Sequence, residues 1–133
     1  MAAYRRRMSS VLRTALRTRL TTAMRERDRA AVSVLRTAVA AIENAEAVPV
    51  DDSRASVGSA DVAGAALGLG ATEADRRRLD EATERAVVAL EVHSLVEAQQ
   101  AYAVAGDHDR ARSAEAGADL LRAVLDETTG SGR

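Results

Sequence analysis

Histidine and carboxylate side chains at helical spacing are the first candidates for chemistry in this sequence. His93 and Glu97 are four residues apart, so both would lie on one face of a helix, where such a pair can bind a metal ion. A pair supplies only two ligands, and we find no third residue at a suitable spacing. We therefore interpret His93 as an ordinary helix histidine and predict neither a metal site nor a cofactor.

Two short acidic clusters have structural explanations as well. Asp107-His108-Asp109 precedes a helical pattern, and carboxylates stabilise the positive N-terminal end of a helix. Asp51-Asp52 lacks the alternating spacing and central glycine of a calcium loop. Nucleophilic catalysis has no better candidate, because the 133 residues include no cysteine and no serine in a Gly-x-Ser-x-Gly turn. We therefore expect a protein that is not an enzyme.

Arginine supplies all 19 basic residues, and the arginines of the first helix form the only candidate ligand surface. Residues 1–48 carry ten arginines against four acids, a balance of +6, whereas residues 49–133 have a balance of −7. Phosphate contacts from an arginine-rich helix would give affinity without sequence readout. The alternative, which we prefer, is that the two halves pack together and neutralise each other. The arginines with helical spacing for a phosphate-binding surface are Arg6, Arg13, Arg17 and Arg25.

Most of the side chains described above are expected to lie on helices or at helix ends. Alanine dominates the hydrophobic residues, Phe and Trp are absent, and Pro49 is the only proline, which together predict an all-α small helical bundle. Residues 12, 16, 20 and 24 form an apolar stripe, widened by Ala15 and Ala23, in a first helix that begins near Ser9 or Ser10. Asp28 is suited to cap a second helix that ends near Ala47, with residues 32, 35, 39 and 42 inward. The short connection predicts an N-terminal antiparallel hairpin.

The second half predicts a long third helix and a C-terminal helix. Thr72 and Asp75 have the arrangement of a capping box, and Gly106 can end a helix that runs to Ala105. Asp107 can cap the last helix. We expect a single domain, 1–133, with a loose N-terminus (1–8), a flexible connection (48–71) and a disordered tail (128–133). The predicted inward residues are Leu79, Ala82, Ala86, Ala89 or Leu90, and Val96 in the third helix, and Ala111, Ala114, Ala118, Leu121 and Leu125 in the last.

Two stretches of the sequence resemble the YqeY-like family, small bacterial helical proteins grouped with the tail of the B subunit of the tRNA-dependent amidotransferase. The succession Ala-Met, Asp, Leu-Arg, Asn and Glu within residues 12–47 carries most of the resemblance. The matching residues are Leu12, Leu16, Leu20, Ala23-Met24, Asp28, Leu35-Arg36, Ala40-Ala41-Ile42, Asn44 and Glu46, then Val87-Val88, Glu91, Glu97-Ala98, Tyr102, Ala105-Gly106 and Leu120-Leu121.

The resemblance implies the helical fold and a bacterial, cytoplasmic protein, but it supplies no catalytic residues. This sequence departs from the family in its longer connection, in His93–Val96 where the family has a basic run, and in Asp107 where it has Arg. Many members continue into a small C-terminal helical module that suggests tRNA contact, and the given sequence does not include that module.

Three functional hypotheses follow. The first is a non-catalytic helical binding or accessory protein with an unknown protein partner; the second is a factor associated with tRNA or RNA; the third, suggested only by the family name, is an amidotransferase component.

No apolar run is long enough for a membrane span. Asp28 and Arg36 are either a polar binding face or a helix cap plus an ion pair. The predicted binding residues are Arg13, Arg17, Arg25, Asp28, Arg36, Asn44 and Glu46.

Overall fold

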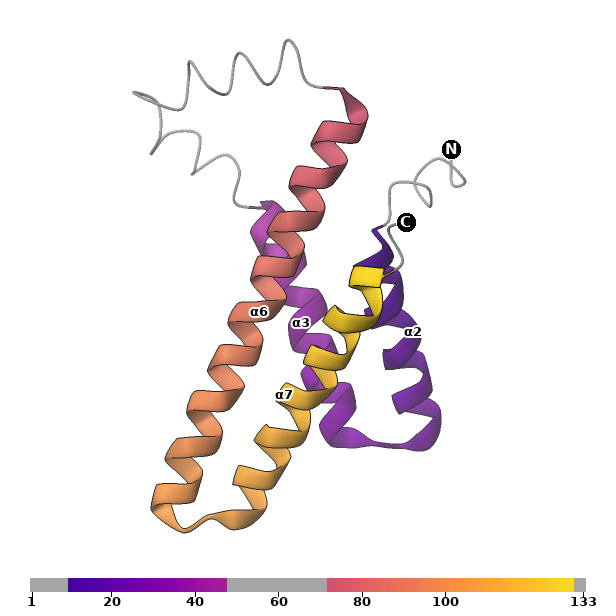
Figure 1. Ribbon diagram of the computed structural model, residues 1–133. Helices are drawn as coiled ribbons and strands as arrows, with labels where there is room; N and C mark the ends of the chain where they lie inside the picture. Colours follow the sequence, from indigo (N-terminus) through magenta and orange to yellow (C-terminus); the bar gives the residue numbers. More distant parts are fainter. Residues whose placement is uncertain (1–9, 48–71, 131–133) are drawn as a thin grey trace, which may run out of the picture.

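Two helical hairpins make up the part of the protein that a computed structural model describes, residues 10–47 and 72–130 (Figure 1). α2 (Val11–Glu26) and α3 (Arg29–Ala47) form the first hairpin, and α6 (Glu73–Ala105) and α7 (His108–Thr129) form the second. These ranges contain no strand, so the predicted all-α helical bundle is confirmed. The predicted loose N-terminus (1–8) and connection (48–71) lie outside the described residues.

Side-chain caps fix where the helices begin. Ser10, Asp28, Thr72 and Asp107 each accept a hydrogen bond from the backbone N–H three residues later, at 3.0–3.2 Å. These bonds satisfy amides that have no partner inside the helix. Gly106 ends α6 with φ +83°, a left-handed conformation that costs glycine little. Each of these capping residues was predicted from the sequence.

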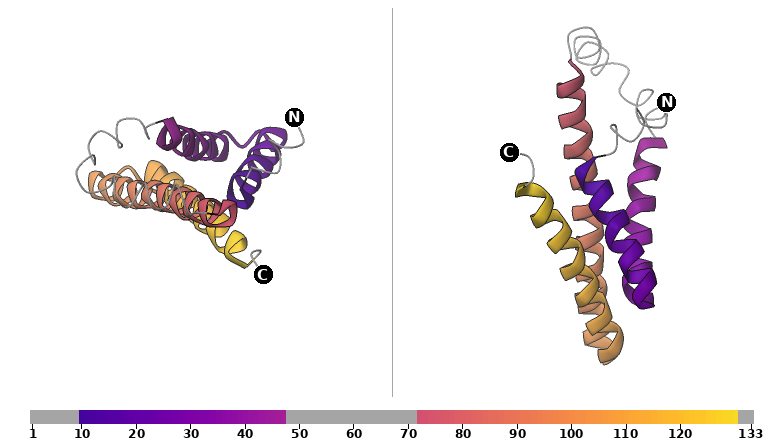
Figure 2. Two further views of the ribbon diagram at one scale, coloured as in Figure 1. Left: turned by 90° about the horizontal axis from the view of Figure 1, so that it is seen from above. Right: turned by 90° about the vertical axis from the view of Figure 1, so that its right-hand side faces the viewer.

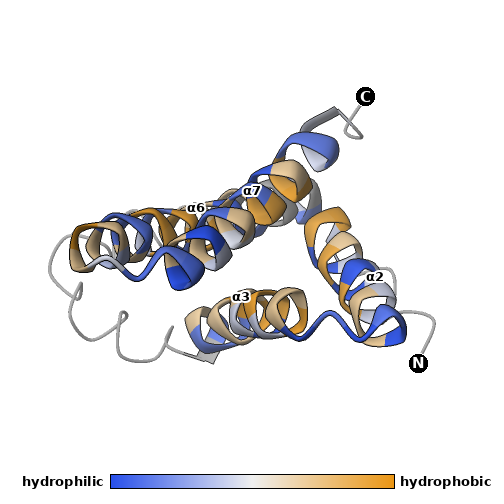
Figure 3. Ribbon diagram, turned by 90° about the horizontal axis from the view of Figure 1, so that it is seen from below, coloured by the Kyte–Doolittle hydropathy of each residue, from blue (hydrophilic) through white to orange (hydrophobic). Residues whose placement is uncertain are grey.

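The core lies where the two hairpins face each other. Apolar faces of α2, α3 and the α6–α7 pair are turned toward a common interior (Figure 3). α2 and α3 cover one side of the layer that α6 and α7 form (Figure 2). The largest fully buried side chains come from all four helices, and they are Leu16, Leu35, Ile42, Val88, Leu121 and Val124.

Small side chains allow α7 to approach α3 closely. A Cβ atom on Gly117 would lie 2.9 Å from Val34 Cγ2 and 3.5 Å from Leu95 Cδ1. Ala111, Ala114 and Ala118 are buried on the same helix. A core without Phe or Trp thus reaches dense packing through short distances between helix backbones.

Two predictions of inward faces were wrong. Met24 is 51% exposed, whereas Ala23 of the same predicted stripe is 5% exposed and lies in the core as expected. In α6 the predicted inward residues Ala82, Ala86, Ala89 and Leu90 are exposed, and the buried residues are instead Glu84, Val88 and Val92. A shift of two residues corresponds to a rotation of about 200° around a helix. Alanine recurs on several faces of α6, so apolar periodicity did not select the correct one.

The last turn of α7 extends into the predicted disordered tail (128–133). The helix continues through Thr129, and only residues 131–133 of that tail lie outside the described residues. Arg85 of α6 donates hydrogen bonds to the Leu125 carbonyl oxygen at 2.7 Å and to the hydroxyls of Thr128 and Thr129. A guanidinium at a helix C-terminus satisfies carbonyls that lack a helical partner and favours the negative end of the helix dipole.

Candidate functional site

The predicted binding residues divide between the two ends of the α2–α3 hairpin. We call the end with Ser10, Arg13, Arg17, Glu43 and Glu46 the hairpin base. The other end, with Arg25, the turn Arg27-Asp28, Arg29 and Arg36, is the hairpin tip. Asn44 is exposed on α3 near the base and makes no hydrogen bond with any described side chain.

Arginines at the hairpin base are paired with carboxylates. Arg13 Nη2 donates to Glu46 Oε1, and Arg13 Nε lies 3.5 Å from Glu84 Oε2. The bond to Glu46 raises the pKa of Arg13 above its ordinary value, although burial opposes this effect. Arg17 Nη2 lies 3.8 Å from Glu43 Oε1. The side chains of Arg13 and Arg17 are therefore directed to α3 and α6, and they do not form the outward row expected of a phosphate-binding helix.

Glu84 is a buried polar residue at the base that the sequence did not reveal. Its residue surface is only 6% exposed, and Glu84 Oε2 accepts a hydrogen bond from Ser10 Oγ at 2.6 Å. Burial raises the pKa of the Glu84 carboxyl, while the Ser10 hydrogen bond and the charge of Arg13 oppose that rise. Its position four and eight residues before Val88 and Val92 was the available clue. Because the wrong inward face was predicted for α6, the burial of Glu84 was not predicted.

The turn at the hairpin tip contains an unusual backbone conformation. Arg27 has φ +58°, the left-handed region that residues other than glycine seldom occupy. Its N–H donates to the Met24 carbonyl oxygen at 3.2 Å, and the Asp28 N–H donates to the Ala23 carbonyl oxygen at 2.9 Å. The prediction that Asp28 caps α3 is confirmed. No ion pair joins Asp28 to Arg36, both of which are among the described residues.

An arginine surface surrounds a shallow depression on one side of the hairpin tip. The depression has a volume of about 730 Å³. Four exposed arginines of the tip, Arg25, Arg27, Arg29 and Arg36, form no ion pair with any residue in the described ranges. Three of them line the depression, whose full lining is Met24, Arg27, Arg29, Val32, Ser33, Arg36 and Thr37. Of this arginine surface, the sequence predicted Arg25 and Arg36 but not the two residues beside the turn.

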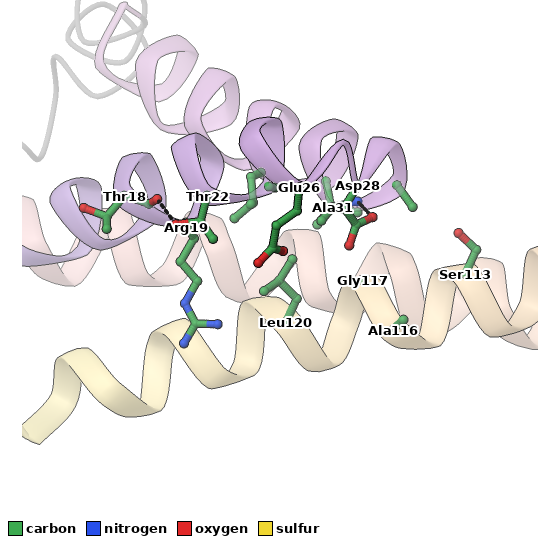
Figure 4. Close-up of a pocket in the computed structure, with 14 residues that line it drawn as sticks. Thr18, Arg19, Thr22, Glu26, Asp28, Ala31, Ser113, Ala116, Gly117 and Leu120 are labelled. Atoms are coloured by element: carbon green, nitrogen blue, oxygen red, sulfur yellow. Dashed lines mark hydrogen bonds between the residues drawn. The ribbon is translucent and has the colours of Figure 1, made fainter.

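A second hollow, which we call the groove, lies between α2, α3 and α7 (Figure 4). Its volume is about 500 Å³. Glu26 and Asp28 line it, so the acids of the hairpin tip face a hollow different from that of the arginines. The full lining is Thr18, Arg19, Thr22, Ala23, Glu26, Asp28, Ala30, Ala31, Val34, Leu35, Ser113, Ala116, Gly117 and Leu120.

Histidines take no part in either hollow. His93 Nε2 lies 2.7 Å from Glu97 Oε1, and both side chains are about two-thirds exposed. Within residues 10–47 and 72–130, no three metal-binding side chains come together. The same residues contain no helix that is both long and apolar enough to span a bilayer.

Comparison with known proteins gives no relative for this chain. No protein-family model matches it, and no curated protein or solved structure matches it either. The resemblance to the YqeY-like family therefore stays a prediction from the residues.

Proposed function

We propose that the protein is a non-catalytic helical binding protein, related to the YqeY-like family, that binds an anionic partner through the arginine surface of the hairpin tip. The observation that supports this is the contrast in pairing. Arginines at the base are matched by carboxylates of α3 and α6, whereas the four at the tip have no carboxylate partner in the described structure.

RNA, including tRNA, is the partner that this arrangement favours. Arginine binds phosphate through two parallel hydrogen bonds, and clustered arginines release counterions from a polyanion. Half-buried Val32 and exposed Met24 lie among these arginines and offer apolar contact to sugars or bases. The family resemblance points in the same direction. A link to tRNA-dependent amidation rests on that resemblance alone.

The positions of the reactive side chains support the non-catalytic part of the proposal. The sequence has no cysteine, and His93 and His108 are exposed on helices. The carboxylate with a raised pKa, Glu84, is hydrogen-bonded to Ser10 and lines neither the depression nor the groove.

Salt-dependent binding of labelled tRNA, measured by fluorescence anisotropy, tests the proposal. If four phosphates are neutralised, raising the salt from about 50 to about 200 mM weakens binding about 100-fold. Arg29→Ala combined with Arg36→Ala should weaken binding at low salt and flatten the salt dependence. The matched control is Arg110→Ala with Arg112→Ala, which removes the same charge from the exposed start of α7.

Two results would contradict the RNA proposal. One is the absence of binding at the lower salt concentration, which would leave an acidic protein as the anionic partner. The other is an equal loss in the tip and control variants, because that outcome would reflect net charge and not the arginine surface.

A further inference from the structure

The groove on the opposite side of the hairpin tip combines an apolar floor with acidic groups at its edge. Buried Ala23 and Leu35 and half-buried Leu120 lie in the floor. Glu26 extends from α2 toward α7 above Leu120, and the carboxylate of Asp28 is turned to the same space (Figure 4). Such a combination of an apolar body and a few polar groups is typical of sites for small molecules.

The charged side chains that line the groove favour a cation. Arg19, the one basic residue of its lining, donates to Glu127 Oε2 at 2.6 Å, so its charge is already compensated. Glu26 has no ion pair with any described residue. It also lies in the last turn of α2, where the helix dipole already places partial negative charge. A cation beside Glu26 would pair with its carboxylate. It would also reduce the unfavourable interaction of that carboxylate with the negative end of the helix dipole.

The size of the groove fits a small molecule. Its volume of about 500 Å³ falls in the range of ligand pockets. This space is large enough for a compact organic ligand that carries one charged group.

We infer that the groove binds a small organic cation, a primary ammonium group attached to an apolar body. The ammonium would lie beside the Glu26 and Asp28 carboxylates, and the apolar body would contact Leu35 and Leu120. Asp28 contributes charge while its Oδ1 atom caps α3. This site is separate from the arginine surface, and it does not depend on the proposed binding of RNA.

Titration of the full-length ¹⁵N-labelled protein with 2-phenylethylammonium tests this inference. We expect saturable shifts of the amide signals of Glu26, Ala31 and Ala116, which line the groove. The neutral isostere 2-phenylethanol lacks the charge and should bind at least tenfold more weakly, as for loss of about one charged hydrogen bond. Methylammonium keeps the charge but buries no apolar body, so it should also bind at least tenfold more weakly.

Three variants locate the site. Glu26→Gln should weaken 2-phenylethylammonium binding about tenfold or more, because one charge-assisted hydrogen bond is lost. Ala116→Leu should abolish it by filling the groove. Glu115→Gln is the matched control, since it removes a neighbouring carboxylate of α7 that does not line the groove, and it should leave the affinity unchanged.

The inference is wrong if 2-phenylethanol binds as tightly as the ammonium, or if Glu26→Gln and Glu115→Gln weaken binding equally. It is also wrong if millimolar 2-phenylethylammonium leaves the groove amides unshifted. Circular dichroism of each variant ensures that a loss of binding is not a loss of helix, and Glu26→Gln alters an exposed side chain that the core does not need.

Discussion

The two ends of the α2–α3 hairpin differ in whether their arginines have carboxylate partners. At the base, Arg13 and Arg17 extend toward carboxylates of α3, and Arg13 also approaches Glu84 of α6. At the tip, Arg29 and Arg36 have no acidic partner in the described structure. The difference comes from α3. Its last two turns carry acids, whereas its first half places Val32, Ser33 and Thr37 along the arginine surface.

This contrast shows that a basic segment of sequence need not be a basic surface. The +6 balance of residues 1–48 leaves two interpretations, a cationic face along the first helix and neutralisation by the acidic second half, of which we prefer the second. Packing neutralises one end of that face and leaves positive charge at the other. Substitutions at each end therefore test whether the base and the tip differ in their contribution to stability and binding.

Removal of the Glu84 carboxylate should have the largest effect. Glu84→Ala leaves the Ser10 hydroxyl without its acceptor and takes a carboxylate away from the Arg13 guanidinium, which we expect to cost about 1–3 kcal/mol of unfolding free energy. Urea denaturation measures this cost. Arg36→Ala is the comparison at the tip, where no described ion pair is lost, and it should leave the urea midpoint almost unchanged. Equal losses at both ends would remove the distinction between base and tip.

The pH dependence of stability should originate at the base. Because the folded protein raises the pKa of Glu84 above its ordinary value of 4.5, folding favours the protonated carboxyl. The stability that this group contributes is present below that value and is lost as the pH rises through the raised pKa. Glu84→Gln, which stays neutral, should thus gain stability relative to the natural protein between acidic and neutral pH. Urea midpoints of the two proteins across this range measure the difference, and a constant difference would contradict the assignment.

Arg27→Gly should raise the stability of the protein but weaken tRNA binding at the tip. Glycine relieves a left-handed strain of about 1 kcal/mol but adds unfolded-state entropy of about 0.5 kcal/mol, so we expect a net gain of about 0.5 kcal/mol. The variant also removes one arginine from the depression, and tRNA binding should weaken. Thermal denaturation and anisotropy provide the two measurements. A variant that is more stable with unaltered tRNA affinity would exclude this side chain from the arginine surface.

Among the residues of the hairpin base, the smallest effect is expected at Arg17. Its pair with Glu43 is 3.8 Å long and more than half exposed on both sides, and such pairs contribute less than about 0.5 kcal/mol. Arg17→Ala should therefore change stability slightly, and only at low salt. A loss as large as that of Glu84→Ala would mean that the exposed part of the base stabilises the hairpin as much as the buried part does.

Local features of the fold could be predicted from sequence because they depend on neighbours along the chain. A cap such as Asp28 acts three residues away, and the stripe in α3 repeats within one helix. The contact between Ser10 and Glu84 joins residues 74 positions apart, and no local pattern encodes it. The sequence placed Arg13 and Arg25 on one phosphate-binding face, but the carboxylates of a second and third helix separate them. Ion pairs across helices depend on which helix faces pack together, and the apolar periodicity of α6 did not identify its inward face.

The close approach at Gly117 has an evolutionary consequence. Val34 is β-branched and stiff, so it cannot move aside for the methyl group that an alanine would place 2.9 Å from its Cγ2 atom. A larger residue at 117 is therefore tolerable only if it is accompanied by a smaller one at 34. In descendants of this sequence the two sites should therefore change together, and their covariation would preserve the spacing of the hairpins over evolutionary time.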